Sequence, residues 1–130
     1  MEAREIALLA AEAASDKKAG DVVVLDVAQT LVITGYFVIA TGTTDRHVRS
    51  IADEVEDQLR ETAGMKPIGR EGEREGRWIL LDFGDVVVHV FQPDERDFYR
   101  LEKLWADAPR VQLPGDVATA PEAQAEAVGS

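Results

Sequence analysis

The chain has few side chains suited to catalysis, and the most suggestive of them lie near residue 80. Two carboxylates, Asp82 and Asp85, flank a Phe83-Gly84 dipeptide, and His89 follows four residues after Asp85. Converging carboxylates can hold a divalent cation. A catalytic metal site ordinarily needs further carboxylates or histidines, so the sequence favours exposure of both groups at a turn over a metal site.

No other residue pattern indicates catalysis. His89 lies among valines, which favours a partly buried histidine that stacks on Trp78 and hydrogen-bonds to a neighbour, while His47 is expected on an exposed helix face. None of the three serines lies in a recognisable nucleophile motif, and glycine-rich phosphate-binding motifs are absent. We therefore predict no catalytic residue and no cofactor.

Composition and charge point to a class of partner. The 130 residues include 14 Lys and Arg against 25 Asp and Glu, a formal net charge of -11. Such a field repels DNA and RNA and attracts basic proteins, although an acidic surface also serves solubility alone. There is no cysteine, as expected for a reducing compartment, and no apolar run of the ~20 residues that span a membrane. These features predict a cytoplasmic protein.

The pattern of apolar residues predicts alternating helices and strands before residue 77. Gly20 and Gly64 are expected to end the two helices, and Thr43-Thr44-Asp45 to cap the second one. A polar loop with three glycines is expected to be mobile because it has no apolar anchor. The predicted segments are a helix over 3–18, strands over 21–26 and 36–40, a second helix that starts at the 43–45 cap and closes near Gly64, a short strand over 65–68 and the polar loop over 69–76.

Residues 77–91 read as an antiparallel hairpin that turns at Phe83-Gly84. This turn would place Asp82 opposite Asp85, Leu80 opposite Val87 and Trp78 opposite His89. One face, formed by residues 79, 81, 86, 88 and 90, is entirely apolar and predicts core. The other mixes apolar and polar side chains, which is typical of a recognition surface with Trp78 as its anchor. Its members are Trp78, Leu80, Asp82, Asp85, Val87 and His89.

The C-terminal part divides into a helix and a tail. Pro93 opens a helix whose apolar stripe comprises Phe98, Leu101, Leu104 and Trp105. From Pro109 onward there is no periodicity. We predict a single α/β domain over 1–108 and a disordered tail over 109–130.

Five stretches of the chain match the motifs of one protein family, in the family's order: Asp16–Val27, Tyr36–Gly42, Asp45–Asp53, Trp78–Phe91 and Phe98–Trp105. On these stretches the chain resembles the ribosomal silencing factors, also called Iojap-like proteins. Gly35 and Gln92 depart from the residues that the family usually has at these positions, Asp and His.

The resemblance implies a fold and a function. It implies a five-stranded mixed β-sheet flanked by helices and related to the nucleotidyltransferase fold. It also implies docking on the large ribosomal subunit, on its ribosomal protein of the L14 family, so that the small subunit cannot join and translation is repressed. Members tend to form homodimers away from the ribosome. The mixed hairpin face, with Trp78 at its centre, would be the docking surface.

Two other functions remain as alternatives. A nucleotidyltransferase-like enzyme would need a Gly-Ser pair at a helix start and an Asp-x-Asp metal pair, but the only Gly-Ser is Gly129-Ser130 and Asp-x-Asp does not occur. Direct RNA binding conflicts with the net charge, although Arg46, Arg49 and Arg100 could make a minor contact with rRNA phosphates. A non-enzymatic binding protein is therefore the prediction.

Overall fold

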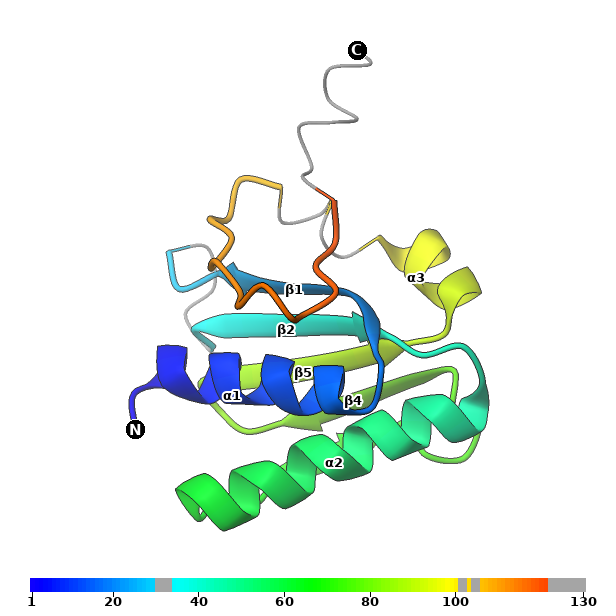
Figure 1. Ribbon diagram of the computed structural model, residues 1–130, viewed down its shortest axis with the longest axis horizontal. Helices are drawn as coiled ribbons and strands as arrows, with labels where there is room; N and C mark the ends of the chain where they lie inside the picture. The colour runs from blue at the N-terminus through cyan, green and yellow to red at the C-terminus, as the bar shows by residue number, and fades with distance from the viewer. Residues whose placement is uncertain (30–33, 101–102, 104–105, 122–130) are drawn as a thin grey trace.

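The computed structural model describes residues 1–29, 34–100, 103 and 106–121, which form a five-stranded mixed sheet with three helices (Figure 1). None of the helices in these ranges is long and apolar enough to cross a membrane. The elements are α1 (Ala3–Asp16), β1 (Gly20–Asp26), β2 (Tyr36–Thr41), α2 (Asp45–Ala63), β3 (Gly69–Glu71), β4 (Trp78–Asp82), β5 (Val86–Phe91) and α3 (Pro93–Tyr99).

The strand order in the sheet is β1-β2-β5-β4-β3. β1 pairs antiparallel with β2, while β3, β4 and β5 form an antiparallel meander. The two parts join through β2 and β5, which pair in parallel, as a connection through a helix such as α2 permits. β5 is therefore a central strand, and its residues are buried except Val87, which is half-buried. The five-stranded mixed sheet that the resemblance implied is confirmed.

Helices α1 and α2 cover one face of the sheet (Figure 1). The buried side of α1 is mostly alanine, which lets the helix lie close to the strands and to α2. α2 begins where the Thr44 side chain accepts a hydrogen bond from the His47 amide and ends at Gly64 in the left-handed conformation. These caps confirm the predicted bounds of the second helix.

The second face of the sheet has a smaller apolar cluster. Its buried members come mainly from β1, β2 and β5, and half-buried Trp78 and Val87 lie at its margin. α3 contacts this face at one end, where the Arg96 guanidinium donates to the Thr41 hydroxyl over 2.7 Å. The buried members are Val23, Leu25, Val27, Phe37, Ile39, Phe91 and Ala108.

The short strand predicted over 65–68 is wrong, because the third strand is Gly69–Glu71. Ile68 is 76% exposed, so the apolar residue that suggested a strand is not in the core. Arg70 holds the true strand in place instead, through ion pairs with α2. Polar anchors of this kind leave no periodic apolar signal in the sequence.

α3 ends earlier than its predicted apolar stripe requires. It stops at Tyr99, and Arg100 follows in the left-handed conformation with φ 49°. Phe98 is 80% exposed and does not pack in the core, contrary to the prediction, because the buried residue of α3 is Arg96. The other three members of the predicted stripe, residues 101, 104 and 105, lie outside the described residues.

Residues 109–121, which the sequence assigned to a disordered tail, run along the outer edge of β1 (Figure 1). Arg110 bridges to Leu25, and Thr119 bridges to Val22. Val111 and Val117 are each 5% exposed and belong to the core. This segment therefore packs on the domain, and only the part of the predicted tail over 122–130 lies outside the described residues.

Candidate functional site

The hairpin of β4 and β5 separates its side chains between two faces as the sequence predicts. Ile79, Leu81, Val86, Val88 and Val90 are buried under α1 and α2. The six residues of the predicted recognition surface differ in their exposure to solvent. Trp78, Leu80, Asp82 and Val87 are half-buried, Asp85 is exposed, and His89 is buried on the second face.

The predicted register of the hairpin is wrong. Trp78 pairs with Phe91, Leu80 with His89, and Asp82 with Val87. The turn residues are Gly84 and Asp85, with φ 91° at Gly84, and the Phe83 amide donates to the Val86 carbonyl over 2.9 Å.

Phe83 gives the physical reason for the different turn. It is only 5% exposed, so its burial moves the turn one residue along the chain. Asp82 and Asp85 are consequently not opposed across the strands, and they need no compensating cation. Asp82 Oδ1 instead accepts a hydrogen bond of 2.8 Å from the Gly84 amide. Among the described residues no group of three or more metal-ligating side chains gathers anywhere.

Trp78 and His89 are hydrogen-bonded to each other. The indole Nε1 donates to His89 Nδ1 over 3.1 Å, which places the imidazole proton of the neutral ring on Nε2. His89 is 5% exposed, and burial lowers its pKa to about 4 because the charged form loses its hydration. The predicted role of His89 as a buried histidine bonded to a neighbour is confirmed, and its evident effect is to orient the indole.

A row of aromatic rings leads from this pair to the surface. Trp78 lies 4.8 Å from Phe91 and 4.5 Å from Tyr99 between ring centroids, and Phe98 packs edge-on against Tyr99 at 5.0 Å. Phe98 and Tyr99 are 80% and 42% exposed. We call Trp78, Phe98 and Tyr99 the aromatic patch. Large exposed aromatic side chains in contact with one another mark interaction surfaces more often than single exposed residues do.

Sequence reasoning missed the two members of the patch that come from α3. It assigned Phe98 to a core stripe because the spacing of apolar residues continued past Tyr99. The local sequence has no signal that would have found them, because charged residues next to apolar ones in the chain are normal for an amphipathic helix. The buried residue of α3 is itself the charged Arg96.

The three arginines considered for rRNA do not form a joint cationic patch. Arg49 is paired with Asp45 at 3.2 Å, and the Arg100 Nε donates to the Asp97 carbonyl over 2.8 Å. Arg46 and Arg49 line an open pocket of about 420 Å³, but three of its seven lining residues are acidic. This mixed charge favours no nucleic-acid backbone. The lining residues are Lys17, Arg46, Arg49, Ser50, Asp53, Glu54 and Asp57.

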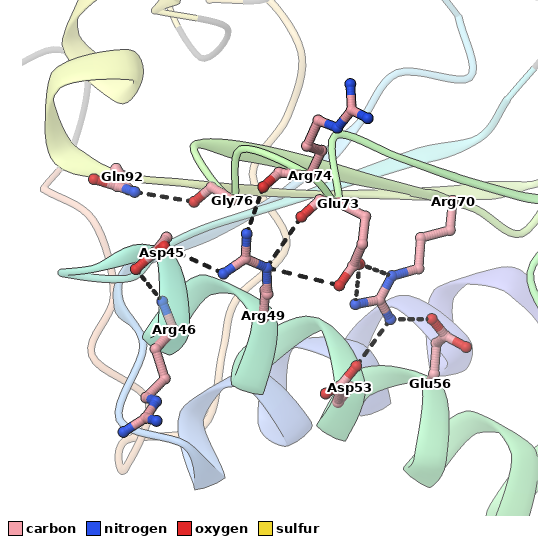
Figure 2. Close-up of polar contacts among 10 residues, drawn as sticks. All are labelled: Asp45, Arg46, Arg49, Asp53, Glu56, Arg70, Glu73, Arg74, Gly76 and Gln92. Carbon is pink, nitrogen blue, oxygen red and sulfur yellow. Dashed lines mark hydrogen bonds and ion pairs between the residues drawn. The ribbon is translucent and has the colours of Figure 1, made fainter.

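The loop that leads into Trp78 is anchored by two arginines, which we call the arginine clasp (Figure 2). Arg49 donates to the carbonyls of Glu73 and Arg74 over 3.0 and 2.6 Å. Arg70 makes ion pairs with Asp53, Glu56 and Glu73, the first at 3.0 Å. The polar loop, which has no apolar anchor in its sequence, is thus held by polar contacts.

Two glycines let this loop pass close to its neighbours. A Cβ on Gly72 would lie 1.9 Å from the Trp78 carbonyl oxygen, and φ there is 87°. A Cβ on Gly76 would lie 2.8 Å from the Asp45 Cβ. Gln92, which opens α3, donates to the Gly76 carbonyl over 3.0 Å. The start of β4 is therefore held from α2 and from α3 at once.

Comparison with known proteins assigns the family. Residues 1–129 match the family model described as ribosomal silencing factor during starvation. The chain belongs to the ribosomal silencing factor family. The family resemblance noted from the hairpin and its flanks is thereby confirmed.

Three relatives illustrate the match. The ribosomal silencing factor RsfS of Bacillus subtilis is 46% identical over 113 residues, which are 87% of this chain and 95% of that protein. A crystal structure of a Chromobacterium violaceum protein superposes with a TM-score of 0.79 at 40% identity, covering 95% of this chain and 98% of the other. The mouse protein named mitochondrial assembly of ribosomal large subunit protein 1 is 32% identical over 91 residues, 68% of this chain and 40% of that protein.

Replacing Gly72 tests how the loop positions β4. Gly72→Ala should lower the free energy of unfolding by about 1–3 kcal/mol, because the methyl group meets the Trp78 carbonyl and φ is positive. Gly69→Ala is the matched control, since nothing lies within 4 Å of its Cβ. Urea denaturation measures both variants, and equal stability of the two would contradict the close approach.

Acidification tests the burial of His89. The unfolded chain, with an ordinary pKa near 6.5, takes up a proton between pH 7 and pH 4.5, whereas the folded chain with its pKa of about 4 largely does not. Stability must therefore fall as the pH falls, by about 2 kcal/mol from this group. Urea denaturation at both pH values should show that His89→Gln loses about 2 kcal/mol less than the wild type. An equal loss would mean that His89 is readily protonated in the folded protein.

Proposed function

We propose that this chain represses translation by binding the large ribosomal subunit through a ribosomal protein of the L14 family and blocking the small subunit sterically. Family membership supports the repressing role, and the name of the mouse relative supports the large subunit as the partner. The observation that carries the surface assignment is the aromatic patch, which joins the half-buried Trp78 to two exposed rings.

The charge of this surface suits a basic protein. Asp82 and Asp85 lie at the hairpin end on a chain of net charge -11, so the field there attracts a cationic partner and speeds encounter. The indole supplies apolar area after contact, and its hydrogen bond to His89 fixes it in advance. Little side-chain entropy is then lost when a partner covers the ring. Leu80 and Val87 would complete the apolar part of the contact.

Both histidines have structural partners, which favours binding over catalysis. The ring of His47 contacts the Thr43 amide at 2.9 Å and the Lys17 carbonyl at 2.6 Å, so it links the start of α2 to the end of α1. His89 is neutral, buried and bonded to Trp78. We therefore propose that the protein is not an enzyme. It would act in the cytoplasm and form a homodimer when it is free of ribosomes.

Substitution of Trp78 tests the anchor. Trp78→Ala should weaken cosedimentation with isolated large subunits by ~30-fold or more, as expected when a central interface tryptophan is removed. Trp78→Phe retains most of the buried ring and should weaken binding less. Far-UV circular dichroism checks that each variant is folded. The surface assignment fails if folded Trp78→Ala cosediments like the wild type while the wild type blocks subunit association.

Neutralising the two hairpin carboxylates tests the role of charge. Asp82→Asn with Asp85→Asn keeps a side-chain acceptor for the Gly84 amide but removes two charges. Association with large subunits at low salt should slow by about ten-fold. Glu12→Gln with Glu61→Gln removes two exposed charges from α1 and α2, across the sheet, and should change the rate less than two-fold. Equal rates for the two double variants would exclude a local charge effect.

Phe98 tests whether α3 extends the docking surface. Phe98→Ala should weaken cosedimentation by about five-fold or more without a loss of stability, because this ring packs on Tyr99 and is otherwise exposed. Thr62→Ala is the control, since Thr62 is exposed and uncharged but lies on α2, across the sheet. If both variants bind alike, the surface does not include α3.

A further inference from the structure

The outer edge of β1 is covered by the chain's own C-terminal residues, which we call the strap (residues 109–121). On this edge the Val22 amide donates to Ala118, and the Ala120 amide donates back to Val22, both over 2.8 Å. The Val111 amide donates to the Val24 carbonyl, and the Asp26 amide donates to the Pro109 carbonyl, again over 2.8 Å. The strap thus satisfies the hydrogen-bonding groups that an edge strand would otherwise leave open.

The strap also reaches around the edge to both faces of the sheet. Val111 and Val117 pack into the core under α1, each 5% exposed. Ala120 packs against the cluster on the second face. The Arg110 guanidinium donates to the carbonyls of Ala120 and Pro121 over 2.6 and 2.7 Å, which ties the returning arm of the strap to the outgoing one.

The strand beneath the strap is well suited to pair with other chains. Val22, Val23, Val24 and Leu25 form a continuous β-branched and apolar run. A run of this kind on an open edge is a template for strand addition between molecules. Flanking Asp21 and Asp26 are the only charges next to it. The need to close this edge therefore explains why a segment without internal periodicity packs here.

We infer that the edge of β1 is a strand-docking surface, that the strap is its intramolecular occupant, and that release of the strap lets a second copy of the chain pair with β1. The domain accordingly extends to residue 121. This edge lies at the opposite side of the sheet from β3, and strand pairing there does not depend on ribosome binding.

A pair of proline variants of the full chain tests the inference. Ala120→Pro removes the amide that donates to Val22, whereas Ala118→Pro is a control because only its carbonyl bonds to β1. The amides of Val22 and Asp26, which donate to the strap, should exchange with solvent at least ten-fold faster in Ala120→Pro. They should change less than two-fold in Ala118→Pro. Hydrogen exchange followed by NMR resolves these amides.

Self-association provides the second readout. Ala120→Pro should form larger species than the wild type in sedimentation velocity, and a synthetic peptide of residues 108–121 should suppress them. Arg110→Ala, which loosens the strap without a proline, should act in the same direction but less strongly. The inference is wrong if both variants keep the wild-type exchange rates at Val22 and Asp26 and also the wild-type sedimentation coefficient. The strap would then not prevent a second copy from pairing with β1.

Discussion

The sheet has two apolar faces, but α1 and α2 cover only one of them. The second face therefore needs a cover of its own. β5 lies in the middle of the sheet and is buried on both sides, so the second face must also be shielded from water. A row of aromatic rings, the short helix α3 and part of the strap supply that cover between them. What they leave exposed is the aromatic patch, and a partner protein would complete the cover.

Polar contacts determine where the patch sits. The arginine clasp fixes the loop before Trp78 on α2, and Gln92 fixes the same loop on the start of α3. The hydrogen bond from the indole to His89 then sets the orientation of the ring. Because His89 is buried and its pKa is lowered to about 4, this contact persists in the neutral form at ordinary pH. An apolar anchor held by polar contacts costs little further ordering on binding.

The outline of the fold could be predicted from local patterns. Several features reflect interactions within a few residues. They are the alternation of β4 and β5, the caps of α2 at Thr44 and Gly64, and the apolar run of β1. The hairpin register could not be read in this way, since the burial of Phe83 in the core under α1 and α2 decided which residues turn. The contacts that anchor the polar loop and the packing of the strap on β1 could not be predicted either, because both bring together residues far apart in the sequence.

Residue types and a period of two are enough to predict the family, the side chains that share each hairpin face and the net negative charge of the chain, because these depend only on local sequence. The surroundings of Trp78, in contrast, depend on contacts between residues far apart in the chain. It placed Tyr99 and Phe98 beside the indole, paired the indole with His89, and separated Asp82 from Asp85. Residues 109–121 likewise have no pattern of their own. They become ordered because β1 offers unpaired amides and carbonyls, and only the folded sheet has such an edge.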